Sequence, residues 1–378
     1  MRSWAKVAIW WVGWVWAQEE GPLRFVVYEG LLERYFKITS WATPASGRPD
    51  TVRHLRAEGY VPLLRSFPKL EALYLSEVEE LDLRDLVSQI QRYCPRLSVL
   101  ALEDCDLEDA SPIAELRLKG LLLDDNPIDN LDFTARLTEL RYLGLARLPV
   151  RDLRFLERLP GLEALDLSET PIENLAPLEK LTQLRMISLF RCVGIRDFSP
   201  LFAAPQLEVL NISHTQPEAA QKLLTSIGRF PQLKVLQAQA VIRSGASLAA
   251  MATLSQLEEL TLGQNPGLTD LSFVRLLKRL LYLDVHACQI RDLSPLAGLP
   301  SLVKLSAGKN QITSLAPLVS CPRLAYLYLY ENPIQDWEKL LEMPALTYVM
   351  LSRRDLSPER LSQLRQQLRK KGVTVEAP

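Results

Sequence analysis

The sequence predicts an α/β solenoid, an arc with a concave parallel β-sheet and short helical or 3-10 segments on its convex side. A motif of the form L-x-x-L-x-L, with Ile, Val or Ala in place of some leucines, occurs thirteen times between residues 70 and 351. Successive motifs start 21 to 27 residues apart, and most steps are 22 or 23 residues. A period near 22 residues indicates stacked repeat units that bury their apolar faces against one another.

Each motif predicts one short strand, because the alternation of apolar and polar residues in L-x-L has the period of a β-strand. In the repeat that starts at Leu162, we expect Leu165 and Leu167 to point inward. Asp166 and Ser168 should then point outward, onto the concave face. Equivalent strands of successive repeats should pair in parallel.

The position that ends each strand holds asparagine in four repeats, where a side-chain amide can hydrogen-bond backbone groups that the turn leaves unpaired. Other repeats hold Thr, Val, Leu or Cys there, so we expect an interrupted asparagine ladder. All five cysteines fall at inward-facing repeat positions, and we expect them to be buried without forming a disulfide. The residues concerned are Asn126, Asn265, Asn310 and Asn332, and Cys94, Cys105, Cys192, Cys288 and Cys321.

The segments that return from the convex side share a second pattern, I-x-x-[LF]-[SA]-P-L. It occurs at residues 172–178, 195–201, 290–296 and 312–318. Together with the strand motif, this pattern resembles the 22-residue class of leucine-rich repeat, whose exported bacterial members are internalin-like. The resemblance implies a solenoid with a concave sheet, and it does not name a partner.

The first 17 residues predict a secretory signal peptide. Arg2 and Lys6 precede an apolar run that ends at Trp16, and the small residue Ala17 precedes the expected cleavage site. We therefore expect residues 1–17 to be removed and the mature protein to be exported, secreted or periplasmic. The apolar run is shorter than the roughly 20 residues that span a bilayer, so stable membrane insertion of the mature chain is not expected.

The two ends of the array need covering segments, because a solenoid exposes apolar surface at its first and last repeats. We expect an N-terminal cap at residues 18–69, about 13 repeats at residues 70–351 and a helical cap at residues 352–378. The second cap should start with a helix whose N-cap is Ser357, followed by a strand at residues 373–375. Within the first cap we expect two strands and then a helix, at residues 24–28, 34–39 and 51–67.

Several classes of function are not expected. The formal net charge of −1 gives no basic surface for nucleic acid. His214 and His286 lie three repeats apart, too far to share a metal ion, and Cys288 should point away from His286. We therefore predict no enzyme activity, no catalytic residues, no metal site and no cofactor.

The predicted outward positions supply the candidate contact residues. The first three repeats carry an acidic group, which either solvates the sheet or binds a basic protein segment. The middle repeats add an aromatic residue and an arginine. The last repeats add tyrosines with basic neighbours, residue types that interfaces concentrate, although cross-strand packing of the tyrosines is the alternative. In chain order these residues are Glu77, Glu103, Asp104, Asp124 and Asp125; Phe190 and Arg191; and Tyr282, Lys304, Lys309, Tyr326, Tyr328, Tyr330, Tyr348 and Arg353.

From these features we predict an exported binding protein that recognises another protein on its concave sheet. The alternative is binding of a carbohydrate or cell-envelope polymer, with the tyrosines stacking on sugar rings.

Overall fold

The computed structural model describes residues 42–43, 51–243 and 248–378. The predicted signal peptide and the strands expected at 24–28 and 34–39 lie outside the described residues. The chain divides into two compact units, Met1–Cys105 and Asp106–Pro378. In both units strands alternate with helical segments and pair in parallel, as the repeat pattern predicts.

The described residues of the first unit contain three strands in chain order. Leu55 of the first strand faces Leu73 of the second, which faces Leu100 of the third, so equivalent leucines form one buried row. The helix between the second and third strands begins after Asp82, whose carboxylate accepts a hydrogen bond from the backbone N–H of Asp85 at 2.9 Å. The elements are β1 (His54–Glu58), the 3-10 turn η3 (Leu64–Ser66), β2 (Ala72–Ser76), α3 (Leu83–Tyr93) and β3 (Val99–Glu103).

The helix predicted at residues 51–67 is wrong, because this segment holds β1 and η3. Leu55 and Ala57 are buried while Glu58 is exposed, which is the alternation of a strand. Arg56, between the two buried residues, lies over the ring of Tyr74 on β2, at 4.5 Å from the ring centroid. Pairing with β2 therefore outweighs the local helical tendency of this segment.

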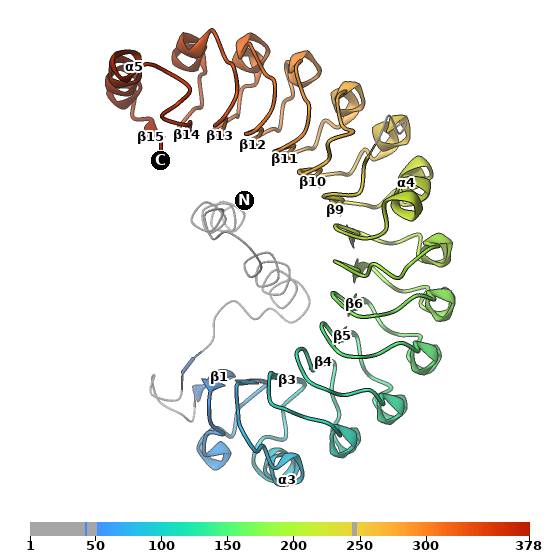
Figure 1. The fold of residues 1–378 in the computed structure, drawn as a ribbon. Coiled ribbons are helices and arrows are strands. Elements are labelled where there is room, and N and C mark those ends of the chain that lie inside the picture. Colours follow the sequence, from blue (N-terminus) through green and yellow to red (C-terminus); the bar gives the residue numbers. More distant parts are fainter. Residues whose placement is uncertain (1–41, 44–50, 244–247) are drawn as a thin grey trace. The chain divides into compact units, whose positions relative to one another are not determined.

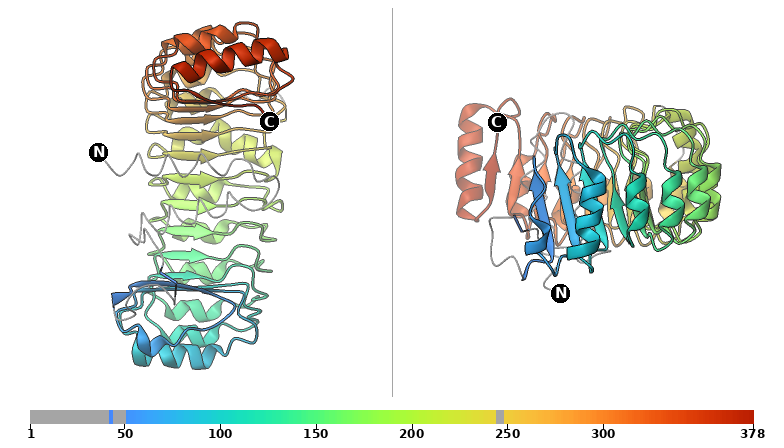
Figure 2. Two further views of the ribbon diagram at one scale, coloured as in Figure 1. Left: turned by 90° about the vertical axis from the view of Figure 1, so that its left-hand side faces the viewer. Right: turned by 90° about the horizontal axis from the view of Figure 1, so that it is seen from below.

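In the second unit, residues 106–243 and 248–378 contain twelve strands in parallel, in-register order. In Figure 1 they line the inner side of this unit, and Figure 2 shows them stacked edge to edge. They are β4 (Gly120–Leu122), β5 (Tyr142–Gly144), β6 (Ala164–Asp166), β7 (Met186–Ser188), β8 (Val209–Asn211), β9 (Val235–Gln237), β10 (Glu259–Thr261), β11 (Tyr282–Asp284), β12 (Lys304–Ser306), β13 (Tyr326–Tyr328), β14 (Tyr348–Met350) and β15 (Thr374–Glu376).

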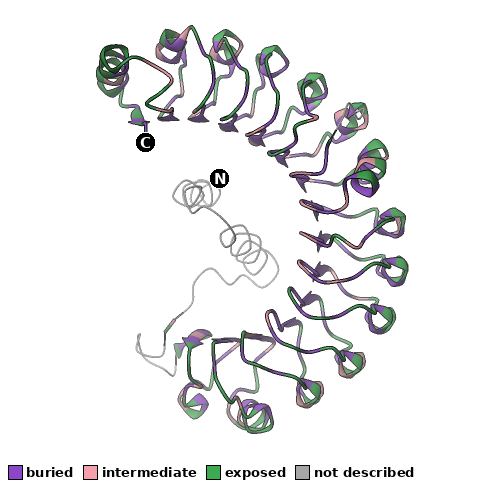
Figure 3. Cartoon of the chain, viewed as in Figure 1, coloured by how far each residue is buried: buried purple, intermediate pink, exposed green. Residues whose placement is uncertain are grey.

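The outer side of the second unit carries mostly 3-10 helices, whose outward residues are exposed in Figure 3. Pro177 occupies the first turn of one of them, where its fixed φ suits a helix start. Asn174 accepts a hydrogen bond from the N–H of Ala176 at 2.9 Å at the same place, and Asp152 does so for Arg154 at 3.0 Å one repeat earlier. The helices are η4 (Ser111–Glu115), η5 (Asp132–Arg136), η6 (Arg154–Arg158), η7 (Ala176–Lys180), η8 (Ser199–Ala203), η9 (Ile227–Arg229), η10 (Ala249–Thr253), η11 (Ser272–Leu276), η12 (Ser294–Leu296), η13 (Ala316–Ser320) and η14 (Trp337–Glu342).

Two longer helices lie in the second unit, and the second of them confirms a prediction from the sequence. The helix α4 (Pro217–Thr225) lies in one of the longer repeats. The helix α5 (Pro358–Lys370) begins after Ser357, whose hydroxyl accepts a hydrogen bond from the N–H of Arg360 at 3.4 Å. The strand β15 follows it and pairs with β14, as the C-terminal pattern predicts.

In many repeats the buried position after the strand carries a side chain that hydrogen-bonds the backbone. Asn310 accepts a hydrogen bond from the N–H of Ile290 at 2.9 Å and donates to the carbonyl oxygens of Val285 and Ala307 at 2.8 and 3.1 Å. In the repeats without asparagine, the Thr170 hydroxyl donates to Leu167 O at 2.6 Å. The thiol of Cys192 lies 2.9 Å from the same oxygen. All five cysteines are buried, as predicted. At the position after the strand, the thiols of Cys105, Cys192 and Cys288 lie near carbonyl oxygens equivalent to those that asparagine binds in other repeats.

Replacing Asn310 with alanine should lower the free energy of unfolding by about 1 to 3 kcal/mol, because the N–H of Ile290 would be left buried without an acceptor. The matched control is Gln311→Ala, which removes a neighbouring exposed amide and should change stability by less than about 0.5 kcal/mol. Thermal and urea unfolding followed by circular dichroism measure both. Equal effects of the two substitutions would contradict the role given to Asn310.

Candidate functional site

The concave face of the second unit ends in a row of residues with an unusual backbone. The third residue after each strand from β4 to β13 has a positive φ, between 50° and 61°, although none of these residues is glycine. This conformation is uncommon for residues other than glycine. We call these positions the terminal row: Asp125, Arg147, Glu169, Arg191, His214, Ala240, Gln264, Ala287, Lys309 and Glu331.

Backbone hydrogen bonds explain this conformation. The N–H of Arg147 donates to the carbonyl oxygen of Ser168 at 2.9 Å, and the N–H of Glu169 donates to that of Phe190 at 2.7 Å. The hydrogen-bond ladder thus continues past the short strands and holds the terminal row at the rim of the sheet. The positive φ could not be predicted from residue types, because none of these residues is glycine. Only their constant place in the repeat distinguishes them in the sequence.

Four residues of the terminal row form a ladder of ion pairs with alternating charge. Arg147 lies between Asp125, at 3.3 Å, and Glu169, at 2.8 Å. Glu169 also faces Arg191 at 3.5 Å. These pairs are partly exposed, and each contributes little to stability, typically below about 1 kcal/mol. Their main effect is to fix the positions of charged side chains at the rim.

The predicted acidic group is therefore less exposed than the sequence suggested. Asp124 is only 3% exposed, because its carboxylate accepts a hydrogen bond from the N–H of Ala146 at 2.8 Å. Asp125 pairs with Arg147. In the first unit, Glu77 and Asp104 are exposed, and Glu103 accepts a hydrogen bond from the hydroxyl of Tyr74.

Phe190 is partly exposed next to this ladder. Its ring meets the ring of His214 edge to face, with centroids 5.4 Å apart. The guanidinium of Arg191 lies 5.1 Å from the centroid of the Phe190 ring. Burial and the charge of Arg191 lower the pKa of His214, so its imidazole is neutral at neutral pH. The three residues form a fixed aromatic and cationic group.

The C-terminal tyrosines share one face, as predicted, but they are not equally exposed. Tyr328 and Tyr348 are 1% and 9% exposed, with ring centroids 5.4 Å apart, so the expectation of exposed rings is wrong for these two. Tyr348 also donates a hydrogen bond to Glu376 at 2.7 Å. Tyr326 and Tyr330 are only partly buried and pack against this cluster. Aromatic rings on neighbouring strands are close enough to cover one another.

A second group of ionisable residues lies beside the tyrosines. Register places Glu259, Tyr282 and Lys304 next to one another on β10, β11 and β12. The ammonium group of Lys304 lies 4.7 and 5.1 Å from the ring centroids of Tyr282 and Tyr328, and Lys304 is 7% exposed rather than exposed as predicted. Burial lowers the pKa of Lys304 to about 8. Burial and the charge of Glu258 raise the pKa of Glu259 to about 7.

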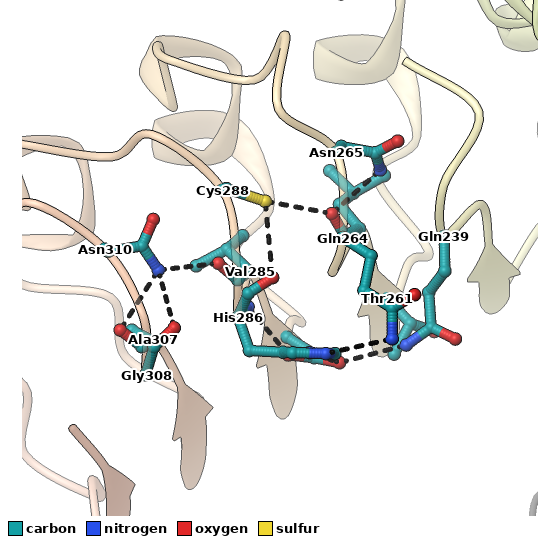
Figure 4. Close-up of polar contacts among 12 residues, drawn as sticks. Gln239, Thr261, Gln264, Asn265, Val285, His286, Cys288, Ala307, Gly308 and Asn310 are labelled. Carbon is teal, nitrogen blue, oxygen red and sulfur yellow. Dashed lines mark hydrogen bonds and ion pairs between the residues drawn. The ribbon is translucent and has the colours of Figure 1, made fainter. Parts of the chain in front are cut away.

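Asp284 and His286, which the sequence analysis did not select together, form a pair on β11 and the turn after it. The carboxylate of Asp284 accepts hydrogen bonds from the backbone N–H of His286 at 3.0 Å and from Gln239 at 3.2 Å. His286 Nδ1 lies 2.9 Å from the same carboxylate. The imidazole lies over Gly263, where a Cβ atom would come within 2.3 Å of Nδ1. Figure 4 shows His286 and Gln239 on one side of the strands, with Cys288 on the other.

The interaction between Asp284 and His286 lowers the pKa of Asp284 and raises the pKa of His286. Burial alone would raise the pKa of Asp284, but hydrogen bonds from His286 hold it below its usual range. Burial and the charge of Lys309 lower the pKa of His286, but the hydrogen bond and charge of Asp284 outweigh them and raise it. Two predicted residues remain. Lys309, whose charge acts on His286, is exposed. Exposed Arg353, which follows β14, donates from Nε to the carbonyl oxygen of Ala377 at 3.0 Å.

The described part of the chain holds neither a cluster of metal ligands nor a membrane-spanning helix. Among these residues, no three His, Cys, Asp or Glu side chains come together in a way that could hold a metal ion. None of the described helices is long and apolar enough to cross a bilayer.

Comparisons with known proteins agree with the repeat architecture. Residues 300–342 match a family model described as leucine-rich repeats in two copies. An internalin from Listeria monocytogenes is 23% identical, with a TM-score of 0.63, and the match covers 78% of this chain and 86% of that chain. A leucine-rich-repeat protein from Leptospira interrogans is 18% identical, with a TM-score of 0.49, covering 87% and 96%. No match was found among curated proteins.

A plant structure is also similar. The leucine-rich-repeat ectodomain of the Arabidopsis thaliana receptor kinase GASSHO1/SCHENGEN3, in complex with Casparian strip integrity factor 2, is 15% identical, with a TM-score of 0.47. The match covers 83% of this chain and 47% of that chain.

Glu259 should make stability depend on pH. Its pKa in the folded protein, about 7, lies above the ordinary value of 4.5, so the folded form keeps a proton that the unfolded chain releases. Stability therefore falls as pH rises from about 4.5 to about 7. Glu259→Gln should remove this loss and increase the free energy of unfolding at about pH 8 by about 1 to 3 kcal/mol, with little change at about pH 4.5.

Unfolding curves at several pH values measure this effect. The matched control is Glu179→Gln, on the exposed side of η7, which should leave the pH dependence unchanged. A parallel pH profile for Glu259→Gln and the unaltered protein would show that Glu259 does not hold a proton in the folded state.

Proposed function

Because the chain is a leucine-rich-repeat protein that resembles an internalin in its fold, we propose that it is exported and binds another protein on the concave sheet of β4 to β15. Leucine-rich-repeat proteins are generally binding scaffolds rather than enzymes, and a solenoid offers an extended concave surface to a macromolecule. The proposal rests on how the concave side chains of the second unit are held.

The group of Phe190, Arg191 and His214 carries the proposal. Phe190 is a partly exposed aromatic ring among small polar neighbours, and Arg191 and His214 hold it in place. Aromatic residues and arginine supply most hot spots of protein interfaces. Because these side chains are already ordered, binding would cost little additional conformational entropy. The adjacent ion-pair ladder, from Asp125 to Arg191, would set the orientation of a charged partner.

Part of the C-terminal tyrosine group extends the proposed surface. Tyr326, Tyr330 and Tyr282 are partly exposed and are proposed contacts, with Lys309 and Arg353 at the rim. We assign the buried rings of Tyr328 and Tyr348 and the buried Lys304 a supporting role, because they hold the exposed tyrosines. In the first unit, Glu77, Glu103 and Asp104 remain proposed contacts for a basic segment.

Binding of a sugar polymer is the less favoured alternative. Stacking on a sugar requires an accessible ring face, whereas Tyr328 and Tyr348 pack against each other and Lys304 lies over the rings of Tyr282 and Tyr328. The buried rings therefore have little surface to offer a sugar.

Substitution of concave residues should abolish capture of the partner. The protein is immobilised and exposed to extract and envelope fractions of the source cells, and bound proteins are quantified by mass spectrometry. Phe190→Ser and the double substitution Tyr326→Ser with Tyr330→Ser should each reduce capture by about tenfold or more, the loss of one hot spot. The matched control is Leu276→Ser on the convex helix η11, which removes a side chain that is 62% exposed.

Thermal unfolding of each variant separates loss of binding from loss of fold. Capture that survives both concave substitutions, or that is lost equally with Leu276→Ser, would contradict binding on the concave sheet. Retention of polysaccharide alone would favour the alternative.

Export has its own test. We expect the mature protein in cells to begin at or near Gln18, because the signal-like segment ends at Ala17. N-terminal sequencing of the protein from culture medium or periplasm measures this. A mature N-terminus at Met1 would contradict export through this segment.

A further inference from the structure

The concave surface of β10 to β12 gathers ionisable residues, whereas β4 and β7 to β9 carry small, apolar or amide side chains at the same positions. The first strand positions hold Glu259, Tyr282 and Lys304 side by side. The third position of β11 holds Asp284, which pairs with His286 at 2.9 Å. The equivalent position holds Asp166 on β6 and Ser188 on β7. Because Ser188 also fits there, the fold does not require charge at this position, and burying it has a desolvation cost.

The basic residues of this cluster that lie at the rim are more exposed than its buried carboxylate. The side chain of Asp284 is 6% exposed, whereas that of His286 is 21% exposed and Lys309 is exposed at the rim. Ala287, between His286 and Lys309 in chain order, adds only a methyl group to the terminal row. The positive groups at this rim are thus His286 and Lys309, and the exposed negative group in the terminal row beside Lys309 is Glu331.

The groups around His286 come from three neighbouring elements. Asp284 lies on its own strand, Gln264 lies 3.5 Å from Nε2 at the end of β10, and the charge of Lys309 acts from the end of β12. Gln239 reaches Asp284 from beyond β9 across Gly263. With Nδ1 turned to Asp284, Nε2 is left for Gln264 and for a ligand.

The charge of the cluster becomes less positive as the pH rises. At mildly acidic pH, Glu259 holds its proton, with a pKa of about 7, and the raised pKa of His286 favours its protonated form, while the pKa of Asp284 is held below its usual range. At mildly basic pH, Glu259 is ionised and Lys304 begins to lose its proton near its pKa of about 8. Both changes remove positive charge from this surface.

We propose that His286 and Lys309, where β11 and β12 end, bind an acidic segment of the protein partner at mildly acidic pH and release it at mildly basic pH, with Glu259 and Lys304 contributing from the other end of these strands. The charges of the exposed groups are complementary to carboxylates, and protonated His286 can donate a charge-assisted hydrogen bond from Nε2. This inference rests on the proposed function, because it assigns chemistry and regulation to the same concave sheet.

The test uses a fluorescein-labelled hexaglutamate peptide, with hexalysine as the charge control, and fluorescence anisotropy at about pH 5.5 and about pH 8. Hexaglutamate should bind about tenfold more tightly at the lower pH. The peptide is itself less charged at that pH, since glutamate has a pKa of about 4.3, so titration of the peptide acts in the opposite direction. Hexalysine should not show this preference.

Variants assign the effect to residues. His286→Gln and Lys309→Gln should each weaken hexaglutamate binding at about pH 5.5 by about three- to tenfold. Glu259→Gln should strengthen binding at about pH 8 and so reduce the difference between the two pH values. The matched control Arg291→Gln removes an exposed positive charge outside the strands and should have no effect. In NMR titrations, saturating hexaglutamate should raise the pKa of His286, which a purely structural role would not do.

Equal affinity at both pH values would overturn the proposal, as would unchanged binding by Lys309→Gln, an exposed position whose substitution leaves the fold intact. The two levels of proposal are separable. If hexaglutamate binds with the expected pH dependence but partner capture survives the Phe190 and tyrosine substitutions, this site is supported and the proposed function is contradicted. If capture depends on those residues but hexaglutamate does not bind, the proposed function is supported and this site is contradicted.

Discussion

The in-register parallel pairing of strands is the constraint on which the rest of this structure depends. Equivalent residues of successive repeats lie opposite one another. Leu260 faces Leu283, which faces Leu305, and the other strand positions are paired in the same way. Strands lie about 4.8 Å apart, so each concave side chain has two fixed neighbours of equivalent position. Its surroundings are therefore decided by the residues one repeat before and one repeat after it.

This constraint explains which side chains of the concave face are exposed. Like charges at neighbouring positions would repel, and in the terminal row Arg147 and Glu169 instead alternate in sign and pair. Large rings at neighbouring positions cover one another, as Tyr328 and Tyr348 do. The exposure of a residue that points outward by its register thus depends on the size of its neighbours, and Phe190 is partly exposed between the small residues Ser168 and Ser213.

The constraint also separates what the sequence could predict from what it could not. The inward leucines, the buried cysteines and the helix α5 follow from the repeat period and from capping by Ser357, and the structure confirms them. The strand β1 was missed because its motif lacks the regular leucines and its pairing with β2 is not local. The contact of Gln239 with Asp284 was missed because it spans two repeats. The contact depends on residues of three successive repeats, because Gln239 reaches Asp284 only where Gly263, in the repeat between them, has no side chain.

Buried charge on the concave floor is the part of the structure that repeat packing leaves unexplained. At the third strand position Ser188 and Thr261 are small and polar, whereas β6 carries Asp166 and β11 carries Asp284. At the first position β12 carries Lys304, whose ammonium group lies over the ring of Tyr282. Removing charges from water costs more than such pairs usually return, so an array shaped by stability alone would not keep them. Residues that depart from the local rule without a gain in packing are expected at functional sites. Asp166 is bound within its own repeat by the N–H and the hydroxyl of Ser168. Asp284 and Lys304 instead lie on the strands next to His286 and Lys309, and this arrangement supports a role in binding for these two buried charges.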